Sequence, residues 1–80
     1  MSLADRLAAL FEKSFQLDSG DFSPNLVPED VMLWDSLGHM NLVMAMEDEF
    51  DVQFEVEEIT EMTTAGKILE ILEAKTAKDS

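Results

Sequence analysis

The sequence contains no cysteine, only two prolines and three glycines, and no long apolar run. The absence of cysteine excludes a disulfide framework and, together with the lack of an apolar leader segment, predicts a cytoplasmic protein. No apolar stretch approaches the roughly 20 residues that span a bilayer, so no contact with a membrane interior is expected. The length predicts one domain, residues 1–80, whose modest core buries about 60% of the unfolded chain's surface.

Basic residues are scarce as well. Five lysines and arginines stand against 18 acidic residues, which gives a formal net charge of −13. This charge argues against nucleic acid or an anionic membrane as a partner and favours partners that carry basic patches. The acids concentrate in residues 36–63, which hold eight acids and no base. A solvated helix face would explain such a run, but that kind of face usually carries interspersed lysines.

Helical spacing of apolar residues begins close to the N-terminus. Residues 2–17 are predicted to form the first helix, with Ser2 as its N-cap. Its apolar face consists of Leu3, Leu7, Leu10, Phe11 and Phe15. Residues 18–35 contain both prolines and are predicted to form a long loop. The apolar residues expected to hold this loop on the core are Leu26, Val27, Val31 and Met32.

A second helix is expected from about residue 35 to residue 50. The residues predicted to form its buried stripe, with Met46 beside them, are Leu37, Met40, Val43, Met44 and Phe50. A turn at residues 51–55 and a short helix at residues 56–62 should follow.

The last helix is predicted to begin after Thr63 or Thr64, either of which can cap it. One face of this helix carries Ala65, Ile68, Leu69 and Leu72, and the positions of Lys75 and Lys78 suit its C-terminal dipole. The chain is expected to fray in residues 76–80. No stretch alternates long enough to form a sheet. The prediction is therefore all-α: a small four-helix bundle of three longer helices and one short helix.

A serine stands at the head of the second helix, in the run DSL at residues 35–37. In the simplest interpretation Asp35 is the N-cap and Ser36 is an exposed first-turn residue. A nucleophilic serine is a second interpretation because His39 is three residues away, but no G-x-S-x-G elbow or orienting group accompanies it. A third interpretation is a hydroxyl that carries a phosphate ester, since a helix N-terminus favours an anion and such a serine needs no base.

The sequence resembles acyl carrier proteins over nearly its whole length. The resemblance rests on DSL at residues 35–37, LVMAMEDEFDVQF at residues 42–54 and EEITEMTTAGKILEIL at residues 57–72. It implies a non-catalytic carrier, acting as a monomer, with 4′-phosphopantetheine attached to Ser36 between Asp35 and Leu37. A phosphopantetheinyl transferase would deliver this arm from coenzyme A. Enzymes that transfer or modify acyl groups would then act on an acyl thioester at the arm's thiol.

The resemblance also gives two larger sets of residues a function. The acids would form a negative surface for the basic patches of partner enzymes: Glu47, Asp48, Glu49, Asp51, Glu55, Glu57, Glu58 and Glu61. Core residues, several of them flexible methionines, would also line a space for the acyl chain. These residues are Met40, Val43, Met44, Met46, Phe54, Ile59, Met62, Ile68 and Leu72.

Four positions near the serine differ from the usual carrier of fatty acid biosynthesis. Gly38 and Asn41 stand where that family commonly has acids, His39 is unusual, and Trp34 replaces a small residue. Gly38 is predicted to weaken the helix start by about 1 kcal/mol relative to alanine. Trp34 is predicted to pack over the helix end and His39 to lie on the helix flank. The run WDSLGHMNL resembles carriers of a specialised pathway, whose cargo is a short, polar or unusual acyl group.

Two other classes of protein remain open. A stand-alone peptidyl or aminoacyl carrier shares the fold and the serine, but its surface is usually less acidic. A small acidic regulatory protein that binds ions is the other class. The loop from Asp18 has an acid at its twelfth position, Glu29, but Gly20, Phe22 and Ser23 do not match an EF-hand. No specific metal ligands are predicted, although clustered carboxylates leave a weak divalent-ion site open.

Overall fold

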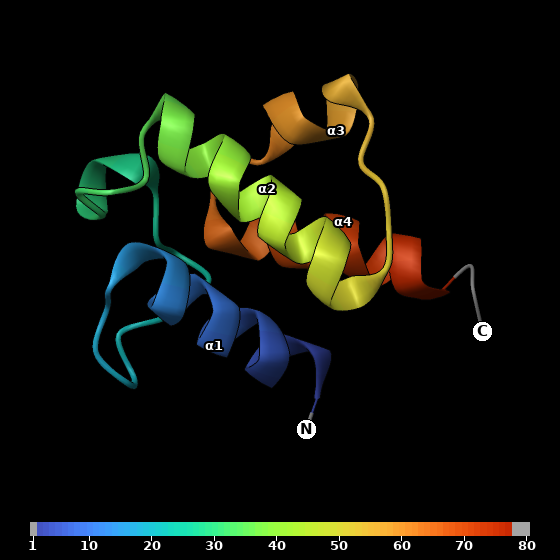
Figure 1. Cartoon of the computed structure of the whole chain (residues 1–80). Coiled ribbons are helices and arrows are strands. Elements are labelled where there is room, and N and C mark those ends of the chain that lie inside the picture. The colour runs from blue at the N-terminus through green and yellow to red at the C-terminus, as the bar shows by residue number, and fades with distance from the viewer. Residues whose placement is uncertain (1, 78–80) are drawn as a thin grey trace.

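The computed structural model describes residues 2–77, and every regular element in that part of the chain is helical (Figure 1). The elements are α1 (Leu3–Phe15), the 3₁₀ helix η1 (Pro28–Asp30), α2 (Ser36–Phe50), α3 (Val56–Glu61) and α4 (Ala65–Ala77). The predicted all-α fold, with three longer helices and one short one, is confirmed, and η1 is an addition. No helix among these residues is long and apolar enough to cross a membrane.

Polar side chains stabilise the helix starts by accepting hydrogen bonds from the first free backbone N–H groups. The Ser2 hydroxyl accepts from the Asp5 N–H at 3.1 Å, and the Thr64 hydroxyl accepts from the Lys67 N–H at 3.0 Å. Ser2 is therefore confirmed as the cap of α1, and Thr64, rather than Thr63, as the cap of α4.

The predicted fraying of residues 76–80 stays a prediction, but the last helix extends into the first two of these residues. Helix α4 continues to Ala77, and the Thr76 hydroxyl donates to the Leu72 carbonyl at 3.0 Å. This bond keeps the polar Thr76 in a helical position. Residues 78–80, including Lys78, lie outside the described residues.

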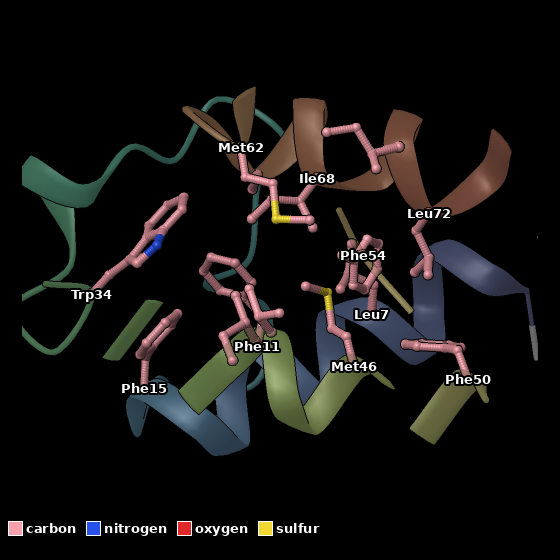
Figure 2. Packing of buried hydrophobic residues seen from close by; sticks show 14 of the residues in the cluster. Leu7, Phe11, Phe15, Trp34, Met46, Phe50, Phe54, Met62, Ile68 and Leu72 are labelled. Atoms are coloured by element: carbon pink, nitrogen blue, oxygen red, sulfur yellow. The ribbon is translucent and has the colours of Figure 1, made fainter. Parts of the chain in front are cut away.

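Helix α1 packs against α2 and α4, and α3 packs against α4, around one core. Trp34 enters this core from the loop and is 2% exposed, which confirms its predicted packing. Its ring lies edge-on to Phe11 at 5.0 Å between centroids and is stacked on Phe15 at 5.9 Å (Figure 2). Such aromatic pairs add to the burial of apolar area. The loop that leads to Ser36 is thus anchored in the aromatic part of the core.

The long loop is also held by backbone hydrogen bonds to the start of α4. The Ala65 N–H donates to the Leu26 carbonyl at 2.9 Å, and the Gly66 N–H donates to the Pro24 carbonyl at 2.8 Å. Val31 is buried, and Leu26 and Val27 are half-buried, as predicted. Met32 is 93% exposed, so its predicted burial is wrong.

The predicted buried stripe of α2 is partly wrong. Val43, Met46 and Phe50 are buried, and Leu42 is buried with them. The side chains of three predicted members of the stripe are exposed by 72%, 45% and 57%: Leu37, Met40 and Met44. The helix is apolar on two faces, and both faces have helical spacing, so periodicity could not select the face that meets α1. The exposed stripe starts beside Ser36.

Candidate functional site

Ser36 is the first residue of α2, and its side chain is exposed. The preceding Asp35 has an extended backbone, and its Oδ1 accepts from the Gly38 N–H at 2.8 Å. Asp35 therefore caps the helix, as predicted, and Ser36 does not. In the part of the chain that the structure describes, no hydrogen bond occupies the Ser36 hydroxyl. The serine oxygen is open to solvent at the positive end of a 15-residue helix.

Gly38 has a steric role that the sequence did not reveal. A Cβ atom built on Gly38 would lie 1.9 Å from the carbonyl oxygen of Leu33. The loop before Ser36 thus passes so close to the first turn of α2 that any side chain at this position would force the backbone to shift. The prediction that Gly38 weakens the helix relative to alanine is wrong for this backbone, because alanine would collide with the loop.

His39 is half-buried on the flank of α2, as predicted, and links two other segments. The Trp34 Nε1–H donates to its Nδ1 at 2.9 Å, and its Nε2 lies 3.1 Å from the Ile59 carbonyl oxygen in α3. The imidazole and the indole are stacked, with 6.2 Å between centroids. Because both ring nitrogens are engaged, His39 is not placed to act as a base for Ser36.

A groove of about 650 Å³ lies beside Ser36 between the loop, the head of α2 and α3. Its lining combines apolar, hydroxyl and acidic side chains: Pro28, Glu29, Trp34, Asp35, Ser36, His39, Ile59, Thr60, Met62 and Thr63. Since Ser36 is part of this lining, a group bound to its hydroxyl has space to lie along the groove. The groove leads from Ser36 toward Met62, which belongs to the core.

Two of the predicted recognition acids also make contacts within the fold. A Glu47 carboxylate oxygen accepts from the Phe54 N–H at 3.0 Å, which ties α2 to the segment before α3. Glu49 forms an ion pair with Arg6 at 3.2 Å, with both side chains largely exposed. An exposed pair of this kind contributes little to stability.

Two further acids build the start of α3. Glu55 and Glu58 form a reciprocal capping box, and Glu58 also pairs with Lys75 at 2.8 Å. The remaining predicted acids are exposed: Asp48, Asp51, Glu57 and Glu61. Asp48 and Asp51 border a hollow of about 740 Å³ beside the C-terminal half of α2. Four of the eight acids therefore also make contacts within the fold, and their function in partner recognition stays a prediction.

The predicted acyl-chain residues differ in their burial. Six are buried in the core: Val43, Met46, Phe54, Met62, Ile68 and Leu72. Figure 2 shows that Met46, Phe54, Met62 and Ile68 point toward the same region between the helices. Ile59 is half-buried at the groove, whereas Met40 and Met44 face solvent. An interior space for a chain therefore excludes these two methionines unless the helices move.

The residues described in the structure include no group of three or more histidine or carboxylate side chains placed to bind a metal ion. Ser36 is exposed and His39 is engaged by other partners, which matches the third interpretation of the serine, a hydroxyl that another enzyme modifies.

Comparison with known proteins identifies the family. A sequence model described as the phosphopantetheine attachment site matches residues 5–72. The solution structure of holo acyl carrier protein from Geobacter metallireducens is similar, with a TM-score of 0.88 and 28% identity over 99% of this chain and 91% of that one. An acyl carrier protein from Thermotoga maritima shares the fold, with a TM-score of 0.80 and 22% identity over 98% of this chain and 91% of that one. The chain belongs to the phosphopantetheine attachment family and is a non-catalytic, phosphopantetheine-bearing carrier of the acyl carrier protein type.

Proposed function

We propose that the Ser36 hydroxyl is the attachment point of 4′-phosphopantetheine and that the chain carries acyl groups on this arm. The observation that supports the proposal most strongly is the exposed, unbonded hydroxyl on the first residue of α2. The arm supplies a terminal thiol, which holds an acyl group as a thioester. Ser36 supplies the ester oxygen, and the free N–H groups and positive dipole of the first helical turn stabilise the phosphodiester charge.

The wild-type chain tests this proposal directly. We expect incubation with coenzyme A and a broad-specificity phosphopantetheinyl transferase to add the mass of one arm, read by intact mass spectrometry. With an acyl-coenzyme A in place of coenzyme A, the added mass should include the acyl group, which hydroxylamine should release as expected of a thioester. An unchanged mass under both conditions would contradict the proposed function.

The exposed acids of α2 are proposed to steer partner enzymes with basic patches toward Ser36. Long-range attraction suits a carrier that must meet many enzymes and leave them quickly. Asp48 is the best residue for a test because it is exposed. The Glu47 carboxylate, by contrast, also accepts a backbone hydrogen bond from Phe54. Asp48 further borders the hollow beside α2, together with Asp51.

We expect Asp48→Lys to lower the rate of loading by the transferase about three- to tenfold at low salt, because it reverses a charge near the site of encounter. The difference should shrink near 0.5 M salt, where the charges are screened. Glu70→Lys is the matched control, since it makes the same change in net charge at an exposed position of α4. Equal rates for Asp48→Lys and wild type at every salt concentration would rule out steering by this residue.

The buried residues that point between the helices are proposed to take up the acyl chain. A thioester-bound chain gains free energy when it leaves water for an apolar interior. In solution NMR, an eight-carbon acyl group should shift the methyl resonances of Met46, Met62 and Ile68 relative to the form that carries the bare arm. The methyl of Met32, which is fully exposed, serves as the internal reference. Identical core resonances in the two forms would contradict the proposal.

The pathway is proposed to be fatty acid biosynthesis or a specialised acyl pathway, and the departures at the head of α2 favour the second. Trp34, Gly38 and His39 act together there: the indole bonds to the imidazole, and Gly38 makes room for the loop. The high negative charge favours an acyl carrier over a peptidyl or aminoacyl carrier. A transferase-loaded chain should therefore accept acyl groups, rather than amino acids, from its partner enzymes.

A further inference from the structure

Helix α3 is a short helix that packs against α4. It has six residues, and none of them is buried. Its last carbonyl groups lack partners within the helix, as at every helix end. One of them, the carbonyl of Ile59, accepts from the Met62 N–H at 3.2 Å and from His39 Nε2 at 3.1 Å. His39 therefore caps the C-terminal end of α3 from a neighbouring helix.

The two partners of His39 determine where its proton lies. The Ile59 carbonyl can only accept, so Nε2 must carry a hydrogen. The Trp34 indole N–H can only donate, so Nδ1 must be free of hydrogen. Only the neutral imidazole with its proton on Nε2 satisfies both contacts. In a protonated ring, Nδ1 also carries a hydrogen, so two N–H groups, one from the imidazole and one from the indole, would point at each other.

We propose that His39 is a proton-sensitive latch that joins the loop before Ser36 to α3 when neutral and releases α3 when protonated. Protonation breaks the hydrogen bond between Trp34 and His39, because the indole N–H then faces a second N–H donor. The imidazole ring must therefore turn or shift. Because the same ring holds the Ile59 carbonyl, this movement also weakens the bond to α3. Through His39, the hydrogen bond to Trp34 in the aromatic core is therefore coupled to the position of Ile59 at the groove beside Ser36.

The charged groups around the groove favour this movement. Among the residues that line it, Glu29 and Asp35 carry carboxylates, and both would attract an imidazolium. Helix α3 contributes only Ile59 and Thr60 to the lining, and α1 meets Trp34 through the uncharged rings of Phe11 and Phe15. The positive end of α2 opposes the imidazolium where it now lies. Displacement toward the groove thus separates the charge from the indole N–H and brings it closer to the carboxylates.

Opening of α3 would widen the route from Ser36 toward Met62 and the core. This consequence rests on the proposed function, because it matters only if a carried chain follows that route. The latch itself does not depend on an attached arm, and the unmodified chain is therefore sufficient to test it. The sequence contains one tryptophan and one histidine, so their ring signals in NMR spectra are unambiguous.

The test follows the ring nitrogens of His39 and the indole N–H of Trp34 by NMR from about pH 8 to about pH 5, the range in which imidazole ordinarily titrates. We expect the proton on Nε2 at the high end. As His39 becomes protonated, the indole resonance should shift, and the hydrogen-exchange protection factor of the Met62 amide should fall about three- to tenfold, the effect of one hydrogen bond. A proton on Nδ1 at high pH would overturn the proposal. So would an indole resonance and a Met62 protection factor that do not change when His39 is protonated.

Two variants separate the latch from the acidic surface. His39→Gln retains a neutral hydrogen-bonding side chain at every pH, so Met62 protection should lose its dependence on pH. Trp34→Phe retains an aromatic ring but removes the opposing N–H, and should likewise abolish the dependence. Persistent pH dependence in His39→Gln would assign it to the carboxylates and overturn the proposal. Loading of each variant, read by intact mass, reports on the carrier function separately.

Discussion

Ser36→Ala is expected to abolish loading by a phosphopantetheinyl transferase completely, with no gain in mass after prolonged incubation. The reason is chemical, because alanine has no oxygen with which to form the phosphodiester. The variant should keep its fold, since Asp35 and not Ser36 caps α2 and the Ser36 side chain is exposed. Its free energy of unfolding should lie within about 0.5 kcal/mol of the wild-type value.

Ser19→Ala is the matched control for this experiment. Ser19 is an exposed serine in the long loop and does not lie at the start of a helix. We expect the control to be loaded at the wild-type rate, whereas thermal melts of both variants should match that of the wild type. A gain of one arm by Ser36→Ala would contradict the assignment of the attachment site, whatever the behaviour of Ser19→Ala.

Gly38→Ala is expected to destabilise the protein by about 1–3 kcal/mol, the usual cost of inserting an atom into a closely packed position. Helix propensity alone predicts the opposite, a gain of about 1 kcal/mol. The sign of the change in the free energy of unfolding therefore shows whether the steric cost or the helix propensity dominates. The new Cβ would lie 1.9 Å from the Leu33 carbonyl oxygen, which belongs to the backbone and cannot rotate away as a side chain would. We expect the melting temperature to fall by roughly 5–15 °C.

Asn41→Ala supplies the control for Gly38→Ala. It lies one turn further along α2 at an exposed position, and alanine there should stabilise the helix slightly through its propensity. A melting temperature that rises in both variants would show that the loop does not press on Gly38. We also expect slower loading of Gly38→Ala, because relief of the collision moves the loop that leads to Ser36.

Much of the helical arrangement could be predicted from the sequence because its determinants are local. Ser2 and Thr64 are capping residues whose side chains reach the third residue of the helix that follows. The prolines at positions 24 and 28 interrupt helix formation in the segment that connects α1 to α2, and the second begins the 3₁₀ helix. Features of this kind need only neighbouring residues, so they can be inferred before the tertiary fold is known.

The buried faces were harder to predict, because burial depends on what a helix packs against. Met44 and Met46 both lie at helical spacing from other apolar residues of α2, yet only Met46 is buried. The packing of α1 against one of the two apolar faces decides this. Met32 and Trp34 are two residues apart in the loop, and the core accepts only the larger of them.

The site was predicted in part. The exposure of Ser36 and the capping function of Asp35 followed from the pattern at the head of α2. The steric advantage of glycine at position 38 did not, because it depends on the path of the loop at Leu33. The link from His39 to Ile59 spans 20 positions of sequence, so no local pattern could reveal it. The internal contacts of the acids could not be predicted for the same reason, since Glu47 and Glu58 bind groups that are distant in the sequence.

Location of the arm on the wild-type chain tests the central claim most directly. After loading from coenzyme A, proteolysis and tandem mass spectrometry should place the whole added mass on the fragment that contains residues 35–37, at the oxygen of Ser36. We expect the other serine-containing fragments to remain unmodified. Added mass on any other residue, or a chain that stays unmodified, would contradict the account.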